Sequence, residues 1–289
     1  MSKGKIKLIL KWLGRLITVF AIAFVVAKIT DYSQQINIKS LSAQTYFITA
    51  FCVLLYAFGN LLLARAWGLL LSGLGSQLKR DSMIWVFGLS QLAKYLPGNV
   101  FHFANRQILG VEQGINNHTL LKSSAWEVGL MIVTASTFST FLITYYFPGL
   151  TWLSLVSFFT LNAVLAGILL RISDINCVKA FGLYLLFFTL SGSLFSAVYL
   201  SLSTHDGVGQ WSLLIAYFVI AWLVGFLTPG APAGLGVREA VLIVLLGTTA
   251  HQETLLLAVL LSRIITVFGD LLFFVIASFC RPRHKISTN

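Results

Sequence analysis

Six stretches of the sequence are apolar for about the 20 residues that an α-helix needs to cross a lipid bilayer. A soluble core cannot hold so many apolar side chains, because 57% of the 289 residues are hydrophobic and only 10% are charged. The sequence therefore predicts an all-α, polytopic transmembrane helix bundle, forming one integral membrane domain over residues 1–289. The six expected spans are Leu10–Ile29, Leu41–Leu63, Lys122–Phe147, Leu150–Leu170, Val178–Leu202 and Thr254–Ser278.

Two further apolar stretches, Ser82–Leu109 and Trp211–Gly247, are each interrupted in the middle by Pro-Gly. Because this pair ends one helix and lets another begin, each stretch is expected to form a re-entrant helical hairpin. Counting the spans makes the two hairpins open from opposite faces, within repeat-like elements at about 82–147 and 211–278. Such inverted, broken helices are typical of transporters with a site near the bilayer midplane.

The formal net charge of +11 comes largely from Lys and Arg at the ends of apolar runs, as at Lys3–Lys11 and Arg281–Lys285. This is the positive-inside pattern, and it predicts cytosolic N- and C-termini in a bacterial cytoplasmic (inner) membrane. The first hairpin then opens from the cytosol and the second from outside. We expect no nucleic-acid partner, since no separate soluble domain carries a basic face.

A short pattern occurs once in each hairpin. Pro97-Gly98 is followed by Arg106, and Pro229-Gly230 is followed by Arg238 at the same spacing. Each break exposes the first backbone N–H groups of a helix inside the apolar layer, and a cation near them makes this region more positive. The pattern therefore favours an anion shared between the arginines and the exposed helix ends.

Polar residues around Arg106 extend this site. Asn99 is expected to cap the helix that follows the first break, and His102 lies on the same helix face as Arg106, with Asn105 beside them. Together they predict a cationic, hydrogen-bonding surface suited to phosphate.

Further ionisable residues lie in or near the spans. Glu239 is a candidate to supply part of the negative charge beside Arg238, but it points about 100° away from Arg238 on the helix, so it need not neutralise it. Arg263 and Asp270 are two helical turns apart on one face and are expected to face the hairpins, either in the site or as a structural ion-pair network, and Glu127 needs a partner inside the bundle. The predicted substrate-binding or translocation residues are Lys94, Pro97, Gly98, Asn99, His102, Asn105, Arg106, Glu127, Pro229, Gly230, Gly234, Gly236, Arg238, Glu239, Arg263 and Asp270.

Residue patterns for catalysis and for cofactors are absent. The Gly-rich Gly230–Gly236 lacks the preceding strand and the Lys-Ser/Thr of a phosphate-binding loop. The histidines lack metal-ligand spacing, and the three cysteines form no CxxC pair. The sequence therefore predicts no metal, no cofactor, no catalytic residue and no enzymatic activity.

The stretch Leu92–Arg106, with Thr228–Gly230 and Gly234–Glu239, resembles the lysylphosphatidylglycerol synthase transmembrane-region family. That family includes the flippase domain of the multiple peptide resistance factor and many stand-alone proteins encoded among envelope polysaccharide genes. The resemblance covers most of the chain and implies a bundle with re-entrant helices that moves a lipid or lipid-linked head group across the bilayer. The site it implies is Pro97, Gly98, Asn99, His102, Arg106, Pro229, Gly230, Gly234, Gly236, Arg238 and Glu239.

The chain ends about ten residues after its last expected span, so the soluble aminoacyl-transferase domain of full-length synthases is expected to be absent. The first functional hypothesis is a flippase for a phosphate-containing lipid or a polyprenyl-phosphate-linked sugar, with an anionic lipid or lipid-linked saccharide as its partner. The second is a scaffold or regulator of an envelope glycosyltransferase, binding that enzyme or a second copy of the chain. The third, a membrane glycosyltransferase, would need Asp31 or Asp206 as its acid.

Overall fold

The computed structural model describes Trp12 and residues 42–96, 100–203, 211–228, 231–247 and 252–281. All regular structure in these ranges is helical. The expected first span, Leu10–Ile29, lies outside them apart from Trp12. The α-helices are α2 (Ala43–Gly73), α3 (Arg80–Gln91), α4 (Phe101–Glu112), α5 (Asn117–Thr137), α6 (Leu142–Tyr146), α7 (Thr151–Ile172), α8 (Ile175–Leu202), α9 (Trp211–Leu227), α10 (Val237–Leu246) and α11 (Gln252–Phe279).

Short 3₁₀ turns connect several of these helices. They are η2 (Leu92–Tyr95), η3 (Phe138–Phe141), η4 (Pro148–Leu150) and η5 (Pro232–Gly234). The turn η3 joins α5 to α6, so that residues 117–146 act as one long span.

Five helices in the described ranges are long and apolar enough to cross a bilayer. They are Ala43–Gly73, Asn117–Tyr146, Thr151–Ile172, Ile175–Leu202 and Thr254–Phe279, which confirms as helices the expected spans that the structure describes. Their outward surfaces carry large apolar side chains, among them Phe47, Phe159 and Phe279. The chain is thus an all-α, multi-pass membrane protein.

Polar side chains cap several helices where a new helix begins. The Ser42 hydroxyl accepts a hydrogen bond from the Thr45 amide at 3.1 Å at the start of α2. Asp174 accepts one from the Cys177 amide at 3.0 Å at the start of α8. These side chains satisfy backbone N–H groups that the first turn of a helix leaves without partners.

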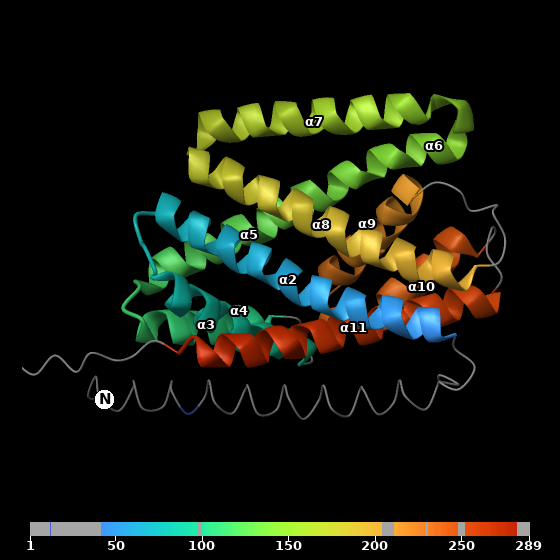
Figure 1. The fold of residues 1–289 in the computed structure, drawn as a ribbon. Coiled ribbons are helices and arrows are strands. Elements are labelled where there is room, and N and C mark those ends of the chain that lie inside the picture. The colour runs from blue at the N-terminus through green and yellow to red at the C-terminus, as the bar shows by residue number, and fades with distance from the viewer. Residues whose placement is uncertain are drawn as a thin grey trace, which may run out of the picture.

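The two Pro-Gly stretches form broken helical pairs, as the sequence predicts. In the first, α3 and η2 lead inward and α4 leads back; in the second, α9 leads inward and α10 leads back. The partners of each pair pack against one another. Figure 1 shows the α3–α4 hairpin at one end of the bundle and the α9–α10 hairpin toward the other.

Small residues allow the long helices to approach closely. A Cβ on Gly192 of α8 would lie 3.0 Å from the Ile215 backbone of α9, so glycine at this position lets the two helices pack closely. A Cβ on Gly269 of α11 would lie 2.7 Å from the Tyr56 ring of α2. Close packing of this kind stabilises helix association in membranes, where the hydrophobic effect between helices is small.

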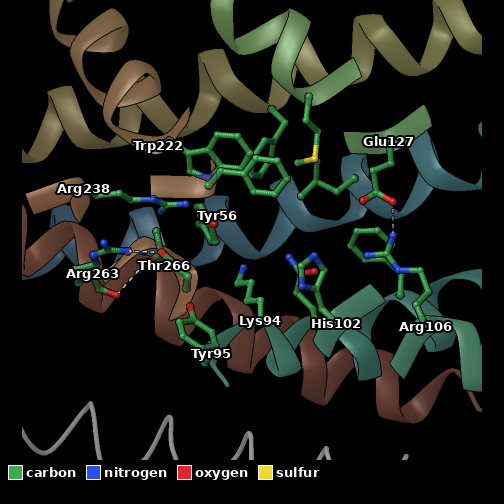
Figure 2. Close-up of a pocket in the computed structure, with 17 residues that line it drawn as sticks. Tyr56, Lys94, Tyr95, His102, Arg106, Glu127, Trp222, Arg238, Arg263 and Thr266 are labelled. Atoms are coloured by element: carbon green, nitrogen blue, oxygen red, sulfur yellow. Dashed lines mark hydrogen bonds and ion pairs between the residues drawn. The ribbon is translucent and has the colours of Figure 1, made fainter. Parts of the chain in front are cut away.

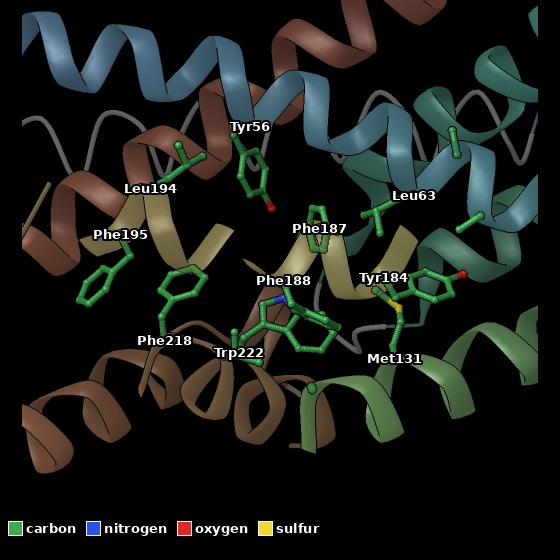
Figure 3. Close-up of a cluster of buried hydrophobic side chains, with 14 of the residues drawn as sticks. Tyr56, Leu63, Met131, Tyr184, Phe187, Phe188, Leu194, Phe195, Phe218 and Trp222 are labelled. Atoms are coloured by element: carbon green, nitrogen blue, oxygen red, sulfur yellow. The ribbon is translucent and has the colours of Figure 1, made fainter. Parts of the chain in front are cut away.

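An aromatic core fills the space between α2, α5, α8 and α9, as Figure 3 shows. The Phe188 and Trp222 rings lie 4.7 Å apart between centroids, and Phe195 stacks on Phe218 at 5.3 Å. The core holds α9 firmly against α8. The inner end of the second hairpin is therefore attached to a packed region rather than to a mobile surface.

Candidate functional site

The break in the second hairpin has a backbone that few residues can adopt. Ala233 has φ 48°, Gly234 has φ 72° and Gly236, the residue before α10, has φ 82°. Glycine takes positive φ freely, whereas alanine there costs about 1–2 kcal/mol. The positive φ angles at two of these positions explain why the segment is rich in glycine.

Arg263 of α11 holds this break in place. Its guanidinium group donates to the carbonyl oxygens of Ala233 at 3.2 Å and of Gly234 at 3.0 Å. It also forms an ion pair with Glu239 of α10 at 2.5 Å. Glu239 thus pairs with Arg263 and not with its neighbour Arg238, in agreement with their angular separation on the helix.

Asp270 of α11 holds the break of the first hairpin in place, as Arg263 holds that of the second. Its carboxylate lies 2.8 Å from the Lys94 ammonium group and accepts a hydrogen bond from the Tyr95 hydroxyl at 2.5 Å. The Asn60 amide donates to it at 3.0 Å, and Gln91 donates to Asn60 at 3.2 Å. Asp270 is fully buried, so these donors supply the solvation that water cannot.

The two breaks meet beside α11. Leu92 and Tyr95 of η2 form one buried cluster with Ala233 of η5 and Val267 of α11. Arg263 and Asp270 lie on either side of Val267, about 10 Å apart along the helix axis at 1.5 Å per residue. The sequence prediction that both face the hairpins is confirmed by their contacts.

Arg106 is enclosed by partners from its own half of the bundle. It forms an ion pair with Glu127 of α5, and its Nε donates to the Ser90 hydroxyl at 3.4 Å. Its guanidinium carbon lies 4.1 Å from the centroid of the Phe87 ring. Arg106 thus has an internal counter-ion, and Glu127 has the partner inside the bundle that the sequence predicts for it. An external anion shared between the two arginines and the helix ends stays a prediction.

A cavity of about 60 Å³ lies between the two hairpins, as Figure 2 shows. Both Arg106 and Arg238 line it, so the two arginines of the repeated pattern share one cavity. Its other polar lining residues are Tyr56, Gln91, Lys94, Tyr95, His102, Glu127, Arg263 and Thr266, and its apolar wall includes Phe87, Phe187, Trp222 and Phe226. Asp270 and Glu239 are not among the lining residues but lie behind the cations that they bind.

Arg238 differs from the other cations of the cavity. Its Nε is buried without a hydrogen-bond partner, and it forms no ion pair with any carboxylate in the described ranges. Its guanidinium carbon lies 5.4 Å from the Trp222 ring centroid. Its side chain passes between two glycines, since a Cβ on Gly225 would lie 2.7 Å from Arg238 Cγ and one on Gly234 would lie 3.0 Å from Nε.

The cationic side chains form a row across the cavity. Figure 2 shows Arg238 and Arg263 at one end, Lys94 near the middle, and Arg106 beyond His102 at the other end. Because Arg263 and Asp270, the partner of Lys94, both lie on α11, this part of the row runs along that long helix.

Several sequence-predicted residues lie elsewhere. Asn105 does not line the cavity but donates to the Leu89 carbonyl at 3.3 Å, which ties α4 to α3. His102 lines the cavity with its ring against Phe103, at 3.9 Å between centroids. Gly234 and Gly236 shape the break and are not in the cavity lining.

The expected cap of α4 is also corrected. The helix begins at Phe101, and Val100 occupies the cap position without a side-chain hydrogen bond. The proposed cap and the four breaker residues lie outside the described residues, as do the two aspartates considered for a glycosyltransferase: Asn99, Pro97, Gly98, Pro229, Gly230, Asp31 and Asp206.

Sequence reasoning missed five residues that shape the site: Tyr56, Asn60, Gln91, Trp222 and Gly225. Asn60 and Gln91 carry the same signal that marked Glu127, since each is a polar side chain inside an apolar helix. Gly225 is a single glycine in an apolar helix, where close backbone approach is one of few reasons for it.

A scan against models of protein families finds no family that matches the chain, and a search of curated proteins finds no match. The resemblance to the lysylphosphatidylglycerol synthase transmembrane-region family therefore stays a prediction, which rests on the residues quoted for it.

Proposed function

We propose that the protein is a flippase that moves a phosphate-containing lipid, or a polyprenyl-phosphate-linked sugar, across the membrane during cell-envelope biogenesis. The observation that carries this proposal is Arg238, a cation without an ionic partner in a cavity shared by both hairpins. An unpaired cation in an apolar bundle costs about 2.5–3.5 kcal/mol on insertion scales, so a bound anion offsets a real penalty. A lipid phosphate supplies that anion while its tails stay in the bilayer.

The arrangement of the hairpins supports movement rather than storage of this lipid. Because they enter from opposite ends, small displacements of one or the other expose the cavity to opposite sides of the membrane. Arg238 offers the phosphate a favourable position inside the apolar layer along the way. No bond of the lipid is made or broken in this scheme, so the proposal assigns no enzymatic step.

The proposed membrane is the bacterial cytoplasmic membrane, with both termini in the cytosol. The loop between α2 and α3 and the end of α7 carry exposed basic residues, among them Lys79, Arg80 and Arg171. These lie on the side from which the first hairpin enters. The positive-inside rule places that side in the cytosol.

The test is lipid flipping in proteoliposomes that contain the purified protein and a trace of anionic fluorescent lipid. Arg238→Gln is expected to abolish flipping, because it removes the unpaired cation while keeping a polar side chain with the same first three carbons. Arg65→Gln is the matched control, since Arg65 is exposed on α2 and loses the same charge. Equal flipping by all three proteins would remove Arg238 from the mechanism and with it the main support for this function.

Arg106→Gln is expected to stop flipping too, but with loss of stability, because it leaves Glu127 buried without its partner. Each variant is therefore checked for a single gel-filtration peak and for its melting temperature.

Native mass spectrometry separates transport from the scaffold hypothesis. A retained anionic lipid that Arg238→Gln removes favours transport, whereas a stoichiometric protein partner without lipid favours a scaffold of an envelope glycosyltransferase.

A further inference from the structure

The charges around the cavity do not balance. The described residues at and directly behind its wall supply four cations, Lys94, Arg106, Arg238 and Arg263, and three carboxylates, Glu127, Glu239 and Asp270. The residues missing from the description at the two breaks, 97–99 and 229–230, carry no charge. The site therefore has a surplus of one positive charge, counting His102 as neutral because a further cation beside Arg106 would be costly.

The surplus is also localised on one side chain. Three of the four cations have a carboxylate within ion-pair distance, and the surplus therefore lies on Arg238. Arg238 lies beside Trp222 and opposite the polar residues of the first hairpin, as Figure 2 shows. A ligand that neutralises the site places a single negative charge at Arg238.

The cavity is unfavourable for a second charge of either sign. The one carboxylate in its lining, Glu127, is already bound by Arg106, and the other two lie behind their cations. A head-group ammonium thus meets cations without a free carboxylate to bind it. A second negative charge would find no unpaired cation among the described residues and would stay uncompensated in an apolar site.

From this balance we infer that the site selects a phosphodiester with one negative charge and a polar but uncharged substituent. Two lipid classes share this chemistry, a glycerophospholipid esterified to a polyol and a sugar linked to a polyprenol through one phosphate. Phosphomonoesters, diphosphates and amine-bearing head groups lack it. The uncharged donors and acceptors of Tyr56, Gln91 and Thr266 suit the hydroxyl groups of such a substituent. This inference rests on the proposed function and names its substrate class.

The test is competitive lipid binding to the full-length protein, followed by native mass spectrometry. Phosphatidylglycerol and a polyprenyl-monophosphate-linked hexose represent the two sources. Phosphatidylethanolamine, phosphatidic acid and a polyprenyl-diphosphate-linked hexose carry the same tails with other charges. At least one of the first two is expected to bind about tenfold more tightly than its charge-altered counterparts, which corresponds to about 1.4 kcal/mol.

Two substitutions change the net charge of the site in opposite directions and make the test specific. Arg238→Gln removes the surplus and is expected to abolish the preference for a single negative charge. Glu239→Gln keeps a hydrogen-bond acceptor for Arg263 but raises the surplus to two, and is expected to shift the preference toward phosphatidic acid or the diphosphate. Arg65→Gln, which changes an exposed charge, should leave the order unchanged, and melting temperatures confirm that all three fold.

The outcomes separate the two proposals. Equal binding and flipping of all the lipids would overturn the charge selectivity but leave the flippase intact. The charge selectivity would also be overturned if Glu239→Gln left the order of lipid affinities unchanged while flipping still depended on Arg238. Failure of every lipid to bind or flip would overturn the proposed function itself.

Discussion

The ammonium group of Lys94 lies 2.8 Å from the carboxylate of Asp270, so the break in the first hairpin is tied to the last helix of the bundle. Asp270 is fully buried and accepts two further hydrogen bonds, from Tyr95 and Asn60. A buried ion pair of this kind adds little net stability but fixes one geometry, because either partner alone is costly.

Replacing Asp270 with Asn should therefore destabilise the protein by about 3–5 kcal/mol, since Lys94 would lose its only ion-pair partner in the described ranges. Unfolding in detergent measures this loss. The double variant Lys94→Gln, Asp270→Asn should recover most of it, because no charge is then left unpaired. A double variant as unstable as the sum of the two single changes would show that the pair is not coupled.

Replacing Arg238 with Gln should have the opposite effect on stability. The substitution removes a cation that has no ionic partner in the lipid-free protein, so we expect a gain of about 1–3 kcal/mol together with loss of flipping. Melting temperature and flipping rate are measured on the same preparation. Loss of both stability and flipping would instead identify Arg238 as a structural residue.

Replacing Gly225 with Ala tests the narrow passage between Gly225 and Gly234 through which the Arg238 side chain reaches the cavity. The new Cβ would lie 2.7 Å from Arg238 Cγ and 3.2 Å from the Gly234 backbone, so we expect displacement of the arginine and at least a severalfold slower flipping rate. Gly129→Ala is the matched control, because a Cβ there meets no atom within 4 Å. Similar flipping by the two variants would exclude this passage as a functional element.

The inverted hairpins predict a pattern of chemical labelling. Single cysteines at Gln77 and Glu112, placed in a background without the three native cysteines, should react with an impermeant maleimide from the cytosolic side. A cysteine at Gly149 should react only from the opposite side. Labelling of Gln77 and Glu112 from different sides would mean that α3–α4 crosses the membrane, and the inverted arrangement would be lost.

The sequence was sufficient for the helices and for where they break, because these depend on local chemistry. Apolar runs of bilayer length became α7 and α8 nearly residue for residue, and Pro-Gly separated α9 from α10. The shared face of Arg263 and Asp270 followed from helical periodicity alone.

Ionic partners could not be predicted in the same way. Arg106 and Glu127 are brought together by the packing of α4 against α5, which no local pattern encodes. Glu239 was correctly separated from Arg238 by its angle on the helix, but its partner Arg263 comes from another helix. The difference between a neutralised Arg106 and an unpaired Arg238 is thus a tertiary property, although the two residues have equivalent places in the repeated pattern.

A single helix, α11, binds both hairpins: Arg263 binds the second and Asp270 binds the first. The spacing between these two anchors is fixed while α11 stays helical, so one hairpin can move relative to the other only if the contacts at Arg263 or at Asp270 are broken. In the proposed transport cycle, either both hairpins shift together with α11, or the contacts of one anchor are released before that hairpin moves.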